Sequence, residues 1–165
     1  MALEIERRFL VKNDNWKKYI TKKTVIEQGY LSYKLEDWII RIRFNGSNFK
    51  IALKKHIENF TNFEFEYLIP NHDGEKIMSN LTNTIKKDRF FLEIEKKQWI
   101  IDCFKEKNFP LEVAEIELSK EEEEFTLPSF VSKEITGLQN LSNFSLTSHP
   151  LSKWNHDDLR TLEKS

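Results

Sequence analysis

The chain has little of several features that often carry function. It has one cysteine, Cys103, so no disulfide can form within it, which is typical of a reducing compartment. Four glycines in 165 residues are too few for a glycine-rich phosphate-binding loop. No stretch approaches the roughly 20 apolar residues that cross a bilayer, and residues 1–11 have no apolar signal core. We therefore expect a cytoplasmic protein that does not engage a membrane.

An excess of charge of one sign is also absent. Lysine and arginine total 26 and aspartate and glutamate total 27, for a formal net charge of −1. This balance argues against nucleic-acid binding through bulk charge. The length suits one domain. We expect that domain at residues 1–155, followed by a polar, flexible tail at 156–165.

Strand patterns dominate what is present. They occur at residues 3–11, 24–33, 37–44, 48–57, 62–69, 84–95, 98–104 and 111–119. Asn45-Gly46 is a strong hairpin-turn signal. Helical patterns are weaker, at 13–21, at 71–82 and in part of 134–148, and Ser119 with Glu122 predicts the capping box of a short acidic helix. Eight strands with short connections predict an antiparallel barrel or sandwich with helices packed outside.

Charged residues follow the strands with a period of two, and neighbours on one face often share their sign. Side chains two residues apart lie on the same face of a strand. The sets on one face are Glu4 and Glu6, Arg41 and Arg43, Lys50 and Lys54, Glu64 and Glu66, Lys87 and Arg89, and Glu115 and Glu117. One interpretation is a set of solvated strand faces. The other is a charged interior, because like charges repel on a surface and the set suits a polyphosphate with a hard cation.

Short motifs at these positions, in the same order, resemble those of the CYTH-domain proteins, also called triphosphate tunnel metalloenzymes. The matching segments are residues 4–11 (EIERRFLV), 28–31 (QGYL), 41–43 (RIR), 53–54 (LK), 64–66 (EFE), 87–90 (KDRF), 99–104 (WIIDCF), 114–117 (AEIE) and 149–154 (HPLSKW). The resemblance implies a mainly β, α+β fold in which an eight-stranded antiparallel closed barrel forms a tunnel.

The same resemblance implies roles for individual residues around Mg²⁺ or Mn²⁺. Metal ligands would be Glu4, Glu6, Asp102, Glu115 and Glu117. Phosphate ligands would be Arg8, Arg41, Arg43, Lys54, Lys87 and Arg89. Glu4, Glu6 and Arg8 would be catalytic, and Glu64 and Glu66 would be supporting carboxylates.

Three positions depart from the family pattern. Arg8 stands where the family has lysine, Ile100 replaces a glutamate, and residues 138–143 lack an arginine and a tyrosine of a late motif. The implied activity is metal-dependent hydrolysis of a triphosphate, with inorganic tripolyphosphate first and ATP or thiamine triphosphate as other substrates. A class IV-type adenylate cyclase and a non-catalytic polyphosphate or nucleotide binder remain alternatives, and a homodimer is an open expectation.

Overall fold

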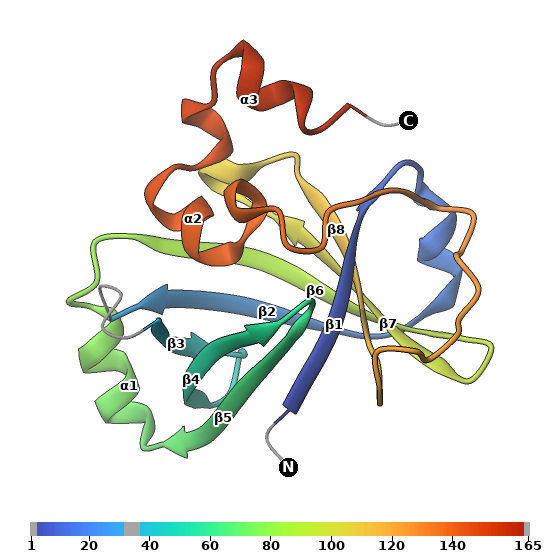
Figure 1. Cartoon of the computed structure of the whole chain (residues 1–165). Coiled ribbons are helices and arrows are strands. Elements are labelled where there is room, and N and C mark those ends of the chain that lie inside the picture. Colours follow the sequence, from blue (N-terminus) through green and yellow to red (C-terminus); the bar gives the residue numbers. More distant parts are fainter. Residues whose placement is uncertain (1–2, 32–36, 164–165) are drawn as a thin grey trace.

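The computed structural model describes residues 3–31 and 37–163 (Figure 1). Its strands are β1 (Leu3–Val11), β2 (Ile20–Tyr30), β3 (Trp38–Phe44), β4 (Phe49–Glu58), β5 (Thr61–Ile69), β6 (Thr84–Ile94), β7 (Lys97–Phe104), β8 (Glu112–Glu117) and β9 (Val131–Glu134). The α-helices are α1 (Asn71–Met78), α2 (Asn143–Ser148) and α3 (His156–Arg160). The 3₁₀ helices are η1 (Asp14–Tyr19), η2 (Glu106–Asn108), η3 (Gln139–Leu141) and η4 (Leu151–Lys153). No helix in these ranges is long and apolar enough to cross a membrane.

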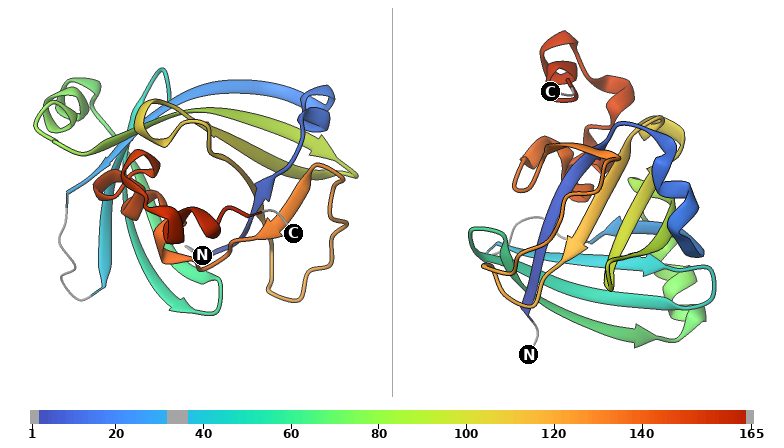
Figure 2. Two further views of the ribbon diagram at one scale, coloured as in Figure 1. Left: turned by 90° about the horizontal axis from the view of Figure 1, so that it is seen from above. Right: turned by 90° about the vertical axis from the view of Figure 1, so that its right-hand side faces the viewer.

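Eight strands close into an antiparallel barrel, as the sequence predicted. Their order is β5-β4-β3-β2-β6-β7-β8-β1, and a short pairing of β1 with β5 completes the ring (Figure 2). The other edge of β1 pairs with β8, from Glu6 opposite Glu117 to Leu10 opposite Val113. The ninth strand, β9, adds to the last residues of β1. Closure removes the free strand edges that an open sheet would expose.

Local signals placed most of the elements correctly. Asn45 accepts hydrogen bonds from the backbone N–H groups of Ser47 and Asn48, and Gly46 has a φ of +90° that favours glycine. Asn13 caps η1 by accepting from the Asn15 N–H. The second strand begins at Ile20, earlier than predicted, and positions 32–33 of that prediction lie outside the described residues. The boundary at residue 155 stays a prediction; the residues after it begin with α3.

The acidic helix predicted after Ser119 is wrong. The N–H and hydroxyl of Ser119 both donate to the Glu123 carboxylate, at 2.6 and 2.7 Å, and the other oxygen of that carboxylate pairs with Lys97 of β7. Glu123, rather than Glu122, therefore satisfies the donors of Ser119. The segment forms an irregular connection tied to the β6–β7 hairpin, because this long-range ion pair replaces the local capping box.

Two apolar clusters lie on different sides of the barrel wall. The first covers the outer face of β1, β7 and β8 and includes Phe9, Trp16, Trp99, Ile116 and Phe130. The second closes one end of the barrel, where Ile85, Phe104, Val113, Leu141 and Leu146 pack together. From above, the C-terminal helical segments lie across this end (Figure 2). The apolar residues therefore leave the middle of the barrel to the charged side chains.

Candidate active site

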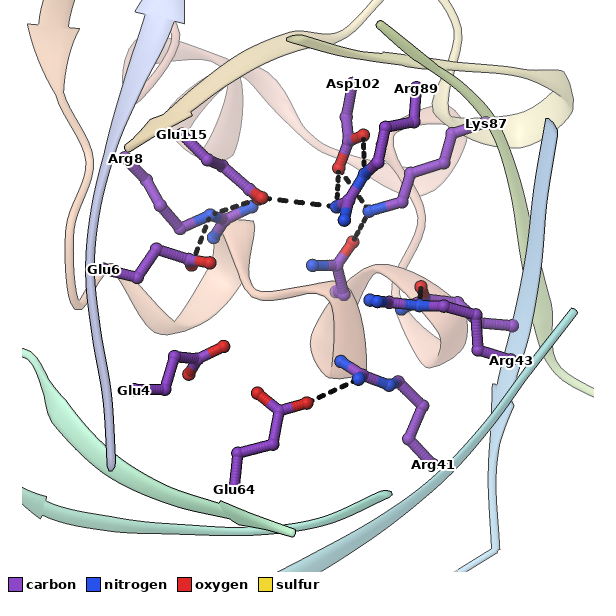
Figure 3. A network of polar contacts seen from close by, with 12 residues as sticks. Glu4, Glu6, Arg8, Arg41, Arg43, Glu64, Lys87, Arg89, Asp102 and Glu115 are labelled. Carbon is purple, nitrogen blue, oxygen red and sulfur yellow. Dashed lines mark hydrogen bonds and ion pairs between the residues drawn. The ribbon is translucent and has the colours of Figure 1, made fainter. Parts of the chain in front are cut away.

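A cavity of about 800 Å³ lies within the barrel. Its charged lining residues are Glu4, Glu6, Arg41, Arg43, Lys54, Glu64, Glu66, Arg89, Lys96, Lys97, Glu115, Glu117 and Glu123. Figure 3 shows Glu4, Glu6, Arg41, Arg43, Glu64, Arg89 and Glu115 of this set converging from several strands. Of the two interpretations of the charged strand faces, the interior one is therefore correct. Three other predicted site residues, Arg8, Lys87 and Asp102, lie beside this cavity in the buried network that borders it.

The strand order sorts the charges into two halves of the wall. The neighbouring strands β8, β1 and β5 carry the glutamate pairs, whereas β6, β3 and β4 carry the basic pairs. Rows across the sheet then bring opposite charges together. Arg41 lies opposite Ala52, and Ala52 lies opposite Glu66, so the small alanine lets the arginine cross to β5. Lys54 lies directly opposite Glu64.

A fully buried ion cluster occupies the end of the cavity nearest α2. Arg89 donates to both oxygens of Asp102, at 2.8 and 2.7 Å, and Lys87 donates to the same carboxylate at 2.5 Å. Burial opposes ionisation of Asp102, but the two cations outweigh it and hold its pKa well below the usual range. Burial lowers the pKa of Lys87 to about 8 against the pull of Asp102. Asn143 of α2 accepts a further bond from Lys87 at 3.1 Å.

Arg8 ties this cluster to β1. Its Nε donates to Glu115 at 3.2 Å, and its Nη1 donates to the carbonyl of Leu141 at 2.9 Å. Arg89 also reaches Glu115, at 3.3 Å. Burial and Asp102 raise the pKa of Glu115, but Arg89 and Arg8 outweigh them and the net shift is downward. The Nη2 of Arg8, which carries two N–H donors, is buried without a hydrogen-bond partner among the described residues.

Glu4 and Glu6 lie in a different electrostatic environment. Glu4 pairs with Lys54 and accepts from Asn62 at 3.3 Å, while Glu6 lies 3.8 Å from the Nε of Arg8. Burial, and then the charge of Glu6, raise the pKa of Glu4 to about 8. Burial and Glu115 also raise the pKa of Glu6. This part of the wall holds more carboxylate than its cations can stabilise.

The wall formed by β3, β4 and β5 holds a second arginine network. Arg41 donates to Glu64 at 2.5 Å and to Glu66 at 3.1 Å, and Lys50 donates to Glu66 at 2.6 Å. Burial opposes ionisation of Glu64, but a hydrogen bond with Glu4 and the charge of Arg41 lower its pKa to about 2. Glu64 and Glu66, predicted as supporting carboxylates, therefore lie against the basic side chains of β3 and β4.

Comparison with known proteins identifies the family. An inorganic triphosphatase from Acetivibrio thermocellus is 30% identical over 152 residues, which cover 91% of this chain and 96% of the relative. This chain belongs to the CYTH family of triphosphate tunnel metalloenzymes. The prediction from the motifs is confirmed. No protein-family model matches the chain.

Solved structures support the CYTH fold independently. The inorganic triphosphatase NE1496 superposes with a TM-score of 0.65 at 24% identity, covering 89% of this chain and 95% of that one. HpAC1 from Hippeastrum, reported to have a dominant triphosphatase activity, superposes with a TM-score of 0.55 at 13% identity, covering 73% and 80%. At these identities, the likeness establishes the shared barrel and no more.

The donor set of this CYTH chain fits a hard divalent cation by its chemistry. Such cations prefer carboxylate oxygens, and the raised pKa values of Glu4 and Glu6 mark carboxylates that lack enough positive charge. In the described ranges, no three His, Cys, Asp or Glu side chains are already grouped as a metal site. A cation would therefore draw the carboxylates together, whereas Asp102 is already held by Lys87 and Arg89.

Three lining or buried residues were missed as site residues in the sequence. Gln28 and Tyr30 of β2 share the inner face, and Asn143 lines the cavity from α2. The period-two spacing of Gln28 and Tyr30 was an available signal, but neither carries a charge. Ile100 also lines the cavity, opposite Glu115 on the neighbouring strand, so the carboxylate expected there is replaced by an apolar surface.

Proposed function

We propose that this CYTH protein hydrolyses inorganic tripolyphosphate with Mg²⁺ or Mn²⁺. The relative from Acetivibrio thermocellus is an inorganic triphosphatase that aligns along nearly its whole length. One structural observation carries the proposal. A cavity of about 800 Å³ within the barrel has a basic half, which suits a chain of phosphates, facing an acidic half, which suits a cation. Burying these charges costs free energy, and a barrel with no charged ligand would gain nothing in return.

The basic half would bind the phosphate chain. Arg41, Arg43 and Arg89 line the cavity, and guanidinium groups make bidentate, charge-assisted bonds to phosphate oxygens. Lys54 adds a fourth positive group beside Glu4. The free Nη2 of Arg8 supports a contact with the phosphoryl group closest to β1. Lys87, which is fully buried against Asp102, would act by orienting Arg89 and Asn143.

The acidic half would hold the cation. Glu4 and Glu6 are the best placed ligands because each forms an ion pair with one cation among the described residues and its pKa is still raised, and Glu117 lies opposite Glu6 in the pairing of β1 with β8. Glu115 and Asp102 are already bonded to cations, so they would support the ligands rather than lead them. A bound divalent cation would neutralise charge on the reacting phosphoryl group and help to position water.

Phosphate release from tripolyphosphate tests the activity directly. We expect release with Mg²⁺ or Mn²⁺ and none with excess chelator, with ATP and thiamine triphosphate measured in parallel to rank substrates. The Glu4→Gln, Glu6→Gln double variant should lose at least ~100-fold of the turnover while remaining folded, because it removes the uncompensated carboxylates. Normal turnover in that variant would refute the assignment of the cation to these residues.

Analysis of the products from ATP and a binding measurement separate the alternatives. Cyclic AMP formed from ATP would indicate a cyclase. Tight tripolyphosphate binding without turnover would indicate the non-catalytic binder, which Ile100 favours because it replaces a carboxylate of the cavity wall. A cytoplasmic location and a homodimer stay predictions, which fractionation and sedimentation would test.

A further inference from the structure

Arg43 differs from the other cations of the cavity in its partners. Arg41, Lys54, Lys87, Arg89 and Arg8 each lie within an ion-pair distance of at least one carboxylate. Arg43 has no carboxylate partner within the part of the chain that the structure describes. Its Nε donates instead to the side-chain oxygen of Gln28, at 3.1 Å. The guanidinium is therefore held in place by a neutral group.

Gln28 is itself fixed from both sides. It is fully buried, at 0% exposed, and lies directly opposite Arg43 in the pairing of β2 with β3. Its Nε2 donates to the hydroxyl of Tyr30 at 2.9 Å, which leaves the side-chain oxygen turned toward Arg43. The Tyr30 ring packs edge-on against Phe144 of α2, with 5.3 Å between centroids. The chain from Phe144 to Arg43 thus leaves the amide little freedom to turn.

The charge of Arg43 is correspondingly unfavourable at its place in the barrel. Burial, and then the neighbouring charges of Arg41 and Arg89, lower the pKa of Arg43 to about 10. The group still carries a full charge near neutral pH. A buried cation without a counter-ion costs free energy that a bound anion would recover. A phosphate group is such an anion, and no carboxylate of the described residues would compete with it for Arg43.

We propose that Gln28 is a positioning residue, which aims Arg43 into the cavity and leaves its positive charge free for a phosphate oxygen of the substrate. The inference rests on the proposed function. Glutamate has the same shape as glutamine but would form an internal ion pair with Arg43 and compete with the phosphate. A smaller side chain would leave the guanidinium without an orienting acceptor. The amide alone combines orientation with neutrality.

The decisive variant is Gln28→Glu, which is compared with the native protein in two measurements. Calorimetric titration with tripolyphosphate in excess chelator measures binding without hydrolysis. We expect the Kd to rise about tenfold, the effect of one lost charge-assisted contact. In urea unfolding without ligand, we expect the same variant to be more stable than the native protein, because the new carboxylate compensates Arg43. A merely structural role for Gln28 would lower stability and affinity together.

Two further variants provide controls. Val25→Glu adds the same negative charge to β2 on its outer face, where Val25 is 48% exposed, and should leave the Kd unchanged. Arg43→Gln should weaken binding by itself, and Gln28→Glu should then add no further loss, because the two changes remove one interaction. Independent, additive losses would contradict the coupling of Gln28 to Arg43.

The outcomes separate this inference from the function on which it rests. No binding of tripolyphosphate by the native protein, with or without Mg²⁺, would overturn the proposed function and the inference together. Native binding with an unchanged Kd in Gln28→Glu would overturn the positioning role alone. A Gln28→Glu protein that unfolds would also overturn it, because added stability is a required result.

Discussion

Two pairs of buried carboxylates in the cavity wall behave in opposite ways. Asp102 and Glu115 each contact two cations, and the pKa of each carboxyl lies below its usual value. Glu4 and Glu6 lie on β1, a short distance along the same wall, and their pKa values are raised. Burial favours the neutral form in all four, and the difference follows the direct ion pairs, which number two each for Asp102 and Glu115 and one each for Glu4 and Glu6 among the described residues.

This difference separates a structural network from one suited to binding. The cluster around Asp102 is complete within the chain, because Arg89, Lys87 and Asn143 supply its bonds. The Glu4 and Glu6 pair is incomplete and gains most from an added positive charge. The proposed division of roles between these acids therefore rests on their local contacts with cations rather than on residue type or depth alone.

The largest effect should come from breaking the complete network. Asp102→Asn removes the shared counter-ion and leaves Lys87 and Arg89 buried side by side, so we expect a loss of about 3–5 kcal/mol in the free energy of unfolding. Urea denaturation followed by tryptophan fluorescence measures it. Asp14→Asn is the control: its partner Lys17 is exposed, so its stability should hardly change. Equal losses in the two variants would contradict the distinction between the networks.

A smaller effect is expected for Glu4, whose ionisation should make the free energy of unfolding depend on pH. The pKa of Glu4 is about 8 in the folded protein against an ordinary 4.5, so the folded state binds its proton more tightly. The stability from this group is therefore present below about pH 4.5 and lost as pH rises to about 8.

The measurement compares urea midpoints of the native protein and Glu4→Gln from pH 5 to 8 without metal. Glu4→Gln should flatten the decline and be the more stable protein at pH 8. Added Mn²⁺ should raise the native midpoint at pH 8 and affect the variant less. Parallel pH profiles for the two proteins would show that Glu4 ionises normally.

The smallest effect is a change in cation affinity at Ile100, which lies opposite Glu115 in the cavity wall. Ile100→Glu places a carboxylate in the cavity opposite Glu115 and should tighten Mn²⁺ binding by about three- to tenfold, because ligand charge raises affinity for a hard cation. Ile100→Gln has nearly the same shape without the charge and should leave affinity near the native value. Manganese binding followed by electron paramagnetic resonance reports it without reference to turnover. Unchanged binding in Ile100→Glu would mean that the cation site lies far from this part of β7 and β8.

Much of the barrel could be read from the sequence because its period-two patterns are strong and its turns are local. Asn45-Gly46 fixes a hairpin through bonds within four residues, which a sequence reveals. The segment after Ser119 fails for the opposite reason. Its Glu123 is committed to Lys97 on another strand, and no local pattern carries that information.

The site shows the same contrast between local patterns, which the sequence reveals, and contacts between strands, which it does not. Like-signed pairs such as Arg41 and Arg43 marked the inner face, but their different partners, Glu64 and Gln28, come from other strands. Lys87 was predicted to contact phosphate on its position in a basic pair. The structure places it, fully buried, against Asp102 and Asn143, and its contact with phosphate remains a prediction. Pairing across the barrel decides what each charge meets.

The closure of the ring through β1 also has a consequence for the order of folding. Leu3 pairs with Phe63 of β5 and Glu6 pairs with Glu117 of β8. Strand β1 therefore cannot pair until these later segments have been synthesised. The hairpins β3–β4 and β6–β7 are local and can form early, whereas pairings of high sequence separation are slow. The pairings of β1 with β5 and β8, which close the ring, are then assembled last. A nascent chain would therefore carry Glu6 of β1 without its cross-strand partner until β8 has been made.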